Sequence, residues 1–331
     1  MGVKNLNRLI RKVCVKILKK TPLSELQNKK IAVDISIYMY KYKQNGDLIE
    51  GMFNMINIFQ KYNIEPIFIF DGKPPVEKQE ILEDRYSKKQ TAKTEYNKLM
   101  IKYNELNKNN IIICNNDCND NSNNNCNKYE LIKLEKELDY YKRNMTKLTY
   151  KDIIDVKKLI HYMGENYYES HIEADSIIAK LVNEEKVWGC MSEDMDMFIY
   201  GCPIVLRYFS LINEEVVVYD LNKILKSLNL THEEFKEICI LSGTDYNSNN
   251  IEFNINFIMK KYIQYSKTNK NITFYEWFST QNYVININKL NKISELFNIK
   301  YVDLSKAKYV NGNKNHKKVV ELLIDYGYIF I

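Results

Sequence analysis

The chain has 331 residues, 45% of them hydrophobic, and 48 Lys and Arg against 42 Asp and Glu give a formal net charge of +6. This hydrophobic content can bury a large core and excludes a wholly disordered chain. No apolar stretch approaches the ~20 residues of a membrane span, so we expect no membrane partner. The N-terminus lacks the apolar run of a secretory signal, and the seven Cys are therefore expected to be reduced in an intracellular protein.

Short apolar runs alternate with helical patterns along the chain. Continuous apolar runs are typical of strands that are covered on both faces of a parallel sheet. They predict strands at residues 30–34, 66–71, 187–191 and 203–209. Apolar residues at helical spacing predict helices at residues 3–19, 48–62, 152–163, 173–185 and 231–242. The alternation favours an α/β fold with a mostly parallel central sheet flanked by helices. Capping boxes at Ser170–Glu173 and Thr231–Glu234 are expected to begin two of these helices.

The segment from about 76 to 150 breaks the alternation. It begins charged and helical, passes through an Asn-rich tract near 107–127 and returns as a Lys-rich helix. We expect a helical insertion with a loop-like or disordered centre. Its three Cys lack a fourth ligand, so a zinc site is not expected. We therefore expect four parts. Residues 1–75 form the first part of the core, 76–150 the insertion, 151–245 the second part of the core and 246–331 a polar helical region.

Acidic residues gather where the predicted strands end. Asp34 and Asp71 close the first two strands, and Asp194 and Asp196 follow the third. Ligands of an open parallel sheet bind at the carboxyl ends of its strands, so these side chains are expected to share one edge. Crowded carboxylates resist ionising without a counter-charge, which a divalent cation with oxygen ligands supplies. The absence of His and Cys from the set argues against zinc. Three further acids are candidates for the same site, Glu173, Asp175 and Asp245.

Each acid also has a plainer interpretation. Asp71 and the Gly after it precede two prolines and fit a simple turn. Glu173 fits the capping box alone, and the stretch from Glu193 to Asp196 fits a solvated loop. Several acids on one predicted sheet edge nevertheless favour a metal site. Two Mg²⁺ ions about 4 Å apart could clamp the attacking and leaving oxygens of a phosphodiester.

At these residues the sequence resembles the flap endonucleases of the XPG nuclease family. The matching stretches, in the family's order and covering roughly residues 1–250, are Met1-Gly-Val3 with Leu6, Ile31–Ser36, Phe70–Pro75, Glu173-Ala-Asp175, Ser192–Asp196 and Ile240–Tyr246. The resemblance implies a PIN-like fold and a structure-specific 5′ nuclease, endonuclease or 5′–3′ exonuclease, acting on flapped or branched DNA in replication, repair or recombination. It also implies two Mg²⁺ ions, replaceable by Mn²⁺, held by all seven acids. Asp175 stands where the family usually has Glu.

The resemblance extends to residues that would contact DNA. Lys78 and Arg85, seven residues apart on one helix face, match cations that reach the scissile phosphate. Tyr40 matches an aromatic residue that stacks on a base, and Gly2 matches a glycine packed near the active site. The insertion corresponds to the helical gateway, arch or cap through which a single-stranded 5′ end passes. The cations expected to line it are Lys88, Lys89, Lys93, Arg143, Lys147 and Lys151.

The resemblance weakens after Asp245. The family has a helix–turn–helix there, whose Gly-Ile-Gly turn grips duplex DNA; the counterpart here is Asn254-Ile255-Asn256, followed by Lys260 and Lys261. The counterpart is degenerate, but Asn tolerates left-handed backbone best after Gly, so we expect Asn254 to keep that backbone conformation and the turn to survive. The C-terminal residues 324–331 lack the Gln-led motif that docks on the sliding clamp, so clamp binding is not predicted and a monomer is expected. Together with the composition, this favours an enzyme of a large DNA virus, acting in the nucleus or at a site of viral replication.

Two other functions stay open at this point. A PIN-like ribonuclease also collects acids at a sheet edge, although the long basic insertion favours DNA. A catalytically silent DNA-binding scaffold is the second alternative. Degenerate relatives of this kind normally lose acids, and this sequence retains all seven.

Overall fold

The computed structural model describes residues 2–114, 121–247, 253–268 and 272–329. Within them, eight strands form one mixed sheet in the order β1-β7-β6-β5-β2-β3-β4-β8. The strands are β1 (Lys19–Pro22), β2 (Lys30–Asp34), β3 (Glu65–Phe70), β4 (Asn166–Glu169), β5 (Gly189–Met191), β6 (Ile204–Ser210), β7 (Glu215–Asp220) and β8 (Lys308–Val310). Strands β2 to β6 pair in parallel, whereas β1, β7 and β8 pair antiparallel at the two sides. The mostly parallel centre was predicted, and the four predicted strands are confirmed as β2, β3, β5 and β6.

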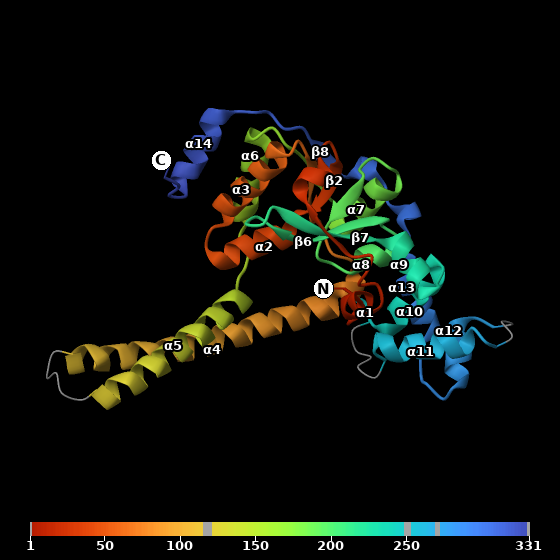
Figure 1. Cartoon of the computed structure of the whole chain (residues 1–331), viewed down its shortest axis with the longest axis horizontal. Helices are drawn as coiled ribbons and strands as arrows, with labels where there is room; N and C mark the ends of the chain where they lie inside the picture. The colour runs from red at the N-terminus through yellow and green to blue at the C-terminus, as the bar shows by residue number, and fades with distance from the viewer. Residues whose placement is uncertain (1, 115–120, 248–252, 269–271, 330–331) are drawn as a thin grey trace.

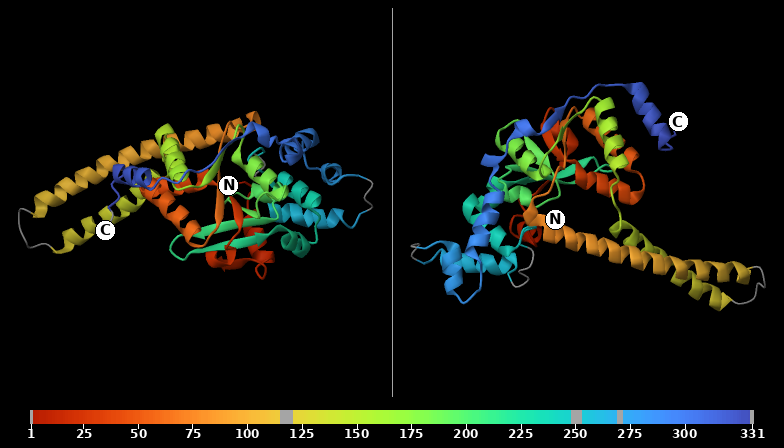
Figure 2. Two further views of the ribbon diagram at one scale, coloured as in Figure 1. Left: turned by 90° about the horizontal axis from the view of Figure 1, so that it is seen from above. Right: turned by 180° about the vertical axis from the view of Figure 1, so that it is seen from behind.

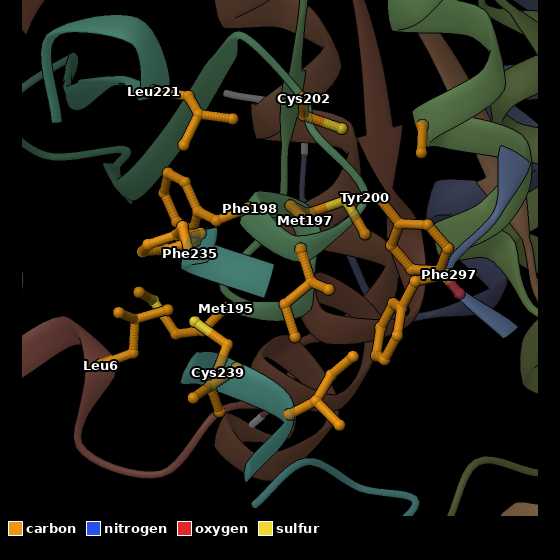
Figure 3. Close-up of a cluster of buried hydrophobic side chains, with 14 of the residues drawn as sticks. Leu6, Met195, Met197, Phe198, Tyr200, Cys202, Leu221, Phe235, Cys239 and Phe297 are labelled. Carbon is orange, nitrogen blue, oxygen red and sulfur yellow. The ribbon is translucent and has the colours of Figure 1, made fainter. Parts of the chain in front are cut away.

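Helices cover both faces of the sheet (Figure 1). Successive strand residues point to opposite faces, so Ala32 enters one core cluster while Ile31 and Val33 enter the other. Figure 3 shows part of the first cluster, to which Leu6, Phe198 and Phe235 belong. The helices of the core and of the C-terminal region are α1 (Leu6–Val13), α2 (Ile35–Asn45), α3 (Leu48–Lys61), α6 (Tyr150–Tyr162), α7 (Ala174–Asn183), α8 (Asp196–Ile199), α9 (Leu221–Leu228), α10 (His232–Ser242), α11 (Ile255–Tyr265), α12 (Phe274–Thr280), α13 (Ile287–Leu296) and α14 (His316–Asp325). None of the described helices is long and apolar enough to cross a bilayer.

The five predicted helices are present, but the first is shorter than expected. Helix α1 ends at Val13, and the chain then turns into the edge strand β1. The capping box of Thr231 and Glu234 is confirmed at the start of α10. The one predicted for Ser170 and Glu173 is wrong, because the hydroxyl of Ser170 accepts a hydrogen bond from the Ile172 amide and Glu173 itself is the N-cap residue of α7.

The insertion is an antiparallel pair of long helices, α4 (Gln79–Cys114) and α5 (Asn121–Asn144). It projects from the core like an arm (Figures 1 and 2). Helix occupies much of the tract near 107–127 where a loop-like or disordered centre was expected: α4 ends at Cys114 and α5 begins at Asn121. Extending an existing helix costs little once it is nucleated, which lets it continue through residues of weak helix propensity. Residues 115–120, with Cys118, lie outside the described part of the chain.

The C-terminal region is helical, as expected, but it also returns to the core. Strand β8 pairs with β4, and α14 packs against α6. Asn254 does not adopt the left-handed backbone that we expected: its φ of −72° and ψ of 154° are extended, and its side chain caps α11 by accepting a hydrogen bond from the Phe257 amide. Residues 248–252, which precede this cap, lie outside the described part of the chain.

Candidate active site

The carboxyl ends of three adjacent parallel strands place acids at one edge of the sheet. Strands β5, β2 and β3 are neighbours in the sheet. Asp34 is the last residue of β2, Asp71 directly follows β3, and Asp194 comes three residues after the end of β5. This is the arrangement that the sequence predicted from the strand ends.

Hydroxyl groups orient the first two acids. The hydroxyl of Ser192 donates to Oδ2 of Asp34 at 2.9 Å, and that of Ser36 donates to Oδ2 of Asp71 at 2.6 Å. The other oxygen of Asp71 accepts from the backbone amide of Ala174, at 2.9 Å. That amide belongs to the first turn of α7, where unpaired N–H groups favour an anion. Asp71 therefore joins the end of β3 to the start of α7.

Asp194 and Asp196 form a tight loop against the N-terminus. The backbone amide of Asp196 donates to Oδ1 of Asp194 at 2.9 Å. Gly2, at a φ of +72°, packs so closely on both acids that a Cβ would overlap a carboxylate oxygen of each. The position therefore needs glycine for its backbone conformation and for the close approach. The structure thus places Gly2 beside the acids, as the resemblance implied.

The insertion brings two cations into the same set of acids. The ammonium of Lys78 donates to Oε1 of Glu173 at 2.5 Å and lies 3.6 Å from Oδ2 of Asp245. The guanidinium of Arg85 lies 2.5 Å from the same oxygen of Asp245. The hydroxyl of Tyr246 donates to the second oxygen of Glu173 at 2.9 Å. Lys78, in the short 3-10 helix Val76–Lys78, is only 7% exposed, so its charge is directed at these carboxylates.

Like charges perturb the ionisation of the acids that lack such a cation. Burial and the negative charge of Asp71 raise the pKa of Asp34 to about 8. Burial raises the pKa of Asp175 well above its ordinary value, with further contributions from Asp194 and Asp34. Asp196 behaves similarly, through burial and Asp194. Asp175 is influenced by acids from three strand ends, Asp194, Asp34 and Asp71, so the ionisation of these carboxylates is coupled.

The donor set fits a hydrated divalent cation. Among the described residues only Lys78 and Arg85 form ion pairs with the seven acids. Oδ1 of Asp196 is buried and has no hydrogen-bond partner in the described part of the chain. No three His, Cys, Asp or Glu side chains of the described residues are grouped closely enough to form a metal cage. Mg²⁺ retains several waters and commonly binds through one or two carboxylates, so an open set of oxygens suits it.

Tyr40 stands at the rim of the site with cations from the insertion. Tyr38 and Tyr42 are buried in the core, whereas Tyr40 is half-buried, and the ammonium of Lys89 lies 4.8 Å from its ring centroid. The ammonium of Lys147 lies 5.1 Å from the ring of Tyr86. Burial, followed by the charges of Lys147 and Arg85, lowers the pKa of Lys89.

Tyr86 was missed by the sequence reasoning. It is 58% exposed, and its position beside Arg85 on a charged helix was the available signal.

The other predicted DNA contacts are more scattered. On the insertion, Lys88 and Arg143 are exposed and pair with acids one helical turn away, and Lys93 is exposed. Lys151 lies on α6 beside the ring of Tyr326, so it does not line the insertion as expected. On α11, Lys260 is exposed, while Lys261 lies over the rings of Phe257 and Tyr283. The structure therefore places Lys78 and Arg85 at the acids, brings Lys89 and Lys147 near Arg85, and leaves the other predicted cations elsewhere.

Two family models match the chain across the strands and helices that carry the acids. The XPG N-terminal domain matches residues 1–92, and the XPG I-region matches residues 164–245. The chain belongs to the XPG family. Flap endonuclease 1 of Glycine max is 28% identical over 265 residues, which cover 74% of this chain and 62% of that protein. Flap endonuclease 1 of Salmo salar is 27% identical over 264 residues, with the same two coverages. The chain thus spans less than two thirds of the length of these two relatives.

Solved structures share the fold of this XPG-family chain at low sequence identity. The catalytic core of Rad2 in complex with a DNA substrate superposes with a TM-score of 0.64, at 19% identity over 99% of this chain and 95% of that one. Flap endonuclease-1 from Methanococcus jannaschii gives a TM-score of 0.60 at 18% identity, over 98% of this chain and 92% of that one. Human GEN1 in complex with Holliday junction DNA gives a TM-score of 0.58 at 19% identity, over 98% of this chain and 72% of that one. The fold is therefore that of the PIN-like 5′ nucleases.

The burial of the acids, together with their mutual repulsion, predicts that removing one of them stabilises the metal-free protein. The pKa of Asp34 is about 8 in the fold and about 4 in an unfolded chain, so its ionisation destabilises the fold as the pH rises between these values. Asp34→Asn removes this cost while its side-chain oxygen can still accept from Ser192. We expect the variant to be more stable than the wild type at pH 8 by at least about 1 kcal/mol, since one pKa unit corresponds to about 1.4 kcal/mol. The measurement is urea unfolding in a chelator from pH 4 to pH 9.

Asp152 provides a matched control, because its pKa is shifted in the opposite direction to that of Asp34. Although burial raises the pKa of its carboxyl, hydrogen bonds from Thr149 and Lys43 lower it overall. Its ionised form therefore stabilises the fold above pH 4, and this contribution is lost as the pH falls. Asp152→Asn should lower the stability at pH 8. A destabilised Asp34→Asn variant at that pH would contradict the repulsion that we assign to the site.

Proposed function

We propose that this chain is a structure-specific 5′ nuclease that hydrolyses phosphodiester bonds of flapped or branched DNA with the help of divalent metal ions. The observation that carries the proposal is the meeting of seven carboxylates with two cations of the insertion at one edge of the sheet. Membership of the XPG family supports it, as do relatives that are named flap endonucleases. The buried carboxylates and the cationic insertion are the features that cleavage of a polyanion requires.

The seven acids are proposed to hold two Mg²⁺ ions, which Mn²⁺ could replace. Such ions, when bound, polarise a phosphodiester and favour ionisation of a water. Asp34 is oriented by the hydroxyl of Ser192, and Asp71 is held at both oxygens by Ser36 and the Ala174 amide. Each carboxylate oxygen has a second lone pair that can face a cation. Asp196 supplies a buried oxygen that has no partner within the described residues. The remaining ligands of the proposed set are Glu173, Asp175, Asp194 and Asp245.

Lys78 and Arg85 are proposed to act on the scissile phosphate. Both hold carboxylates in the DNA-free protein, at Glu173 and Asp245, through charge-assisted hydrogen bonds. A phosphate oxygen is an equally good acceptor for ammonium and guanidinium donors. As negative charge develops on the phosphate, these donors stabilise it more strongly than they stabilise the ground state.

The cations beside Tyr40 are proposed to guide the single-stranded 5′ end. Burial and the nearby charges of Lys147 and Arg85 lower the pKa of Lys89, and a bound phosphate would relieve the repulsion among these three cations. Tyr40 offers a ring at the rim of the site on which a base can stack. Further phosphate contacts along the strand and the duplex are proposed for Gly2, Lys88, Lys93, Arg143, Lys151, Lys260 and Lys261.

The function predicts Mg²⁺-dependent cleavage of a labelled 5′-flap duplex near its branch. Asp196→Asn keeps the size of the side chain but removes its charge. A bound ion contributes several kcal/mol of transition-state stabilisation, so the single-turnover rate should fall about a thousandfold or more. DNA binding should persist, because the acids attract no phosphate themselves. The measurement is single-turnover cleavage with a parallel binding assay.

The matched control is Asp325→Asn, which changes an exposed acid of α14 and should leave the rate unchanged. Absence of flap cleavage by the wild type at any Mg²⁺ or Mn²⁺ concentration would refute the function. Cleavage of matched RNA flaps in preference to DNA flaps would favour the ribonuclease alternative instead.

The role given to Lys78 predicts that its replacement slows cleavage, whereas replacement of an exposed lysine of the same insertion does not. Lys78→Met keeps the length of the side chain and removes its charge. Losing one donor to the developing charge should slow single-turnover cleavage by about 10²–10³-fold. Lys98→Met is the control, because Lys98 is exposed on α4 and pairs with the nearby Glu95. Wild-type cleavage by Lys78→Met would show that Lys78 serves only to neutralise Glu173.

A further inference from the structure

The N-terminal segment carries a concentration of positive charge that the active site does not use. Residues 1–20 contain no Asp or Glu and seven cations, which are Lys4, Arg8, Arg11, Lys12, Lys16, Lys19 and Lys20. Helix α1 buries Leu6, Leu9 and Ile10 against the core. Its opposite face exposes Arg8, Arg11 and Lys12, and Lys16 is exposed just beyond the helix. We refer to these four cations as the α1 basic face.

Most of the α1 basic face has no acidic partner. Lys19 and Lys20, further along the chain, are neutralised by Glu25 and Glu215 at 2.6 and 2.8 Å. Within the described residues, by contrast, no carboxylate pairs with Arg8, Lys12 or Lys16. Unpaired surface cations on one helix face are typical of a surface that binds a polyanion.

Tyr208 completes this surface from the neighbouring strand. It lies in the bulge of β6 with a φ of +56°, a left-handed conformation that bulky residues rarely adopt. Its ring, 40% exposed, lies 5.8 Å from the guanidinium carbon of Arg11 and 5.1 Å from that of Arg207. The side-chain amide of Asn7, on α1, donates to its hydroxyl at 2.5 Å. An acid, Glu193, also contacts these residues. Its carboxylate accepts a hydrogen bond from the backbone amide of Tyr208 and forms an ion pair with Arg207.

The N-terminal segment that carries the α1 basic face runs from the active site to the C-terminal helices. Gly2 touches Asp194 and Asp196, and the Lys4 amide donates to the carbonyl of Gly243, two residues before Asp245. Further along, α1 packs against α9 and α11. Figure 1 shows α1 beneath the sheet beside α10 and α11, and on the far side of the core from α14. A strand leaving the acids toward α11 would therefore pass this face.

We propose that the α1 basic face, with Tyr208, binds the phosphate backbone of the double-stranded arm of the DNA substrate. The inference rests on the proposed nuclease function and adds a contact surface to it. Arg8 and Lys12 are one helical turn apart, about 6 Å along a rigid axis, which suits the regular backbone of a duplex. Binding of unstacked single strands instead uses several free aromatic rings. Here the single ring of Tyr208 already lies against two guanidinium groups.

The test is the salt dependence of DNA binding by Arg8→Gln/Lys12→Gln, measured in a chelator so that no cleavage occurs. The probes are a 5′-flap DNA with long duplex arms and a single strand of the same length. Each lost phosphate contact lowers the slope of log K against log salt by about 0.9 on duplex DNA. We expect a smaller slope and a several-fold weaker affinity for the duplex-armed probe, with unchanged binding of the single strand.

Two matched variants separate this contact from a general loss of charge. Lys314→Gln/Lys317→Gln removes two exposed cations from the region of α14 and should bind like the wild type. Arg8→Lys/Lys12→Arg keeps both charges and should also bind like the wild type.

Unchanged slopes and affinities for the duplex-armed probe would overturn the inference, as would equal losses on the single strand. Equal losses in the α14 control would overturn it as well, because they would show a long-range effect of net charge. These outcomes are independent of the nuclease function. A protein that bound the probes but cut none of them would refute that function and leave the binding comparison decisive.

Discussion

Electrostatic repulsion among seven carboxylates at one edge of the sheet is the constraint on which the rest of the site depends. Parallel strands β5, β2 and β3 deliver their acids to the same place because their carboxyl ends coincide. Burial then makes each negative charge costly, and it raises the pKa of Asp34, Asp175 and Asp196. Every neighbouring feature supplies positive charge or a hydrogen-bond donor to this edge. Ser36, Ser192 and the first turn of α7 supply donors, and Gly2 lets the backbone approach.

The insertion is tied to the site through the same electrostatics. Lys78 and Arg85 lie in its first turns, and their ion pairs with Glu173 and Asp245 fix where α4 leaves the core. These contacts are short and largely buried, so separating them would leave carboxylates without compensation. In the proposed function the cations exchange carboxylate for phosphate oxygen when DNA arrives. The position of the insertion and the ionisation of the acids are then coupled, since both depend on the side chains of Lys78 and Arg85.

Much of the site could be predicted from the sequence because strand ends are readable from apolar runs. Asp34, Asp71, Asp194 and Asp196 lie at or just after the ends of such runs. Once the strands are taken to be parallel, these acids are predicted to lie at the same edge of the sheet. Glu173 shows where this reasoning stops. Its spacing from Ser170 satisfies a capping box, but the tertiary partners Lys78 and Tyr246 take both oxygens of its carboxylate. Local pattern cannot reveal a partner that lies about a hundred residues away in the chain.

The elements that the sequence missed depend on similar long-range contacts. Helix α2 has apolar residues at nearly alternate positions, which obscures a helical period, and its burial against α3 and β3 decides the outcome. Strand β8 is three residues long and exists only because β4 offers an edge. At Asn254 the left-handed tendency of Asn yields to its ability to cap α11, since the free amide of Phe257 is satisfied in that way. Tyr208 owes its unusual backbone to contacts with α1 and Glu193.

Calorimetric titration of Mn²⁺ into the protein tests the central claim most directly, with the wild type compared with an Asp34→Asn/Asp196→Asn double variant. If the buried carboxylates are arranged for divalent counter-charge, the wild type should bind about two ions, and the double variant should lose most of this binding while remaining folded. An equal heat of binding in both proteins, or none in the wild type, would contradict the account.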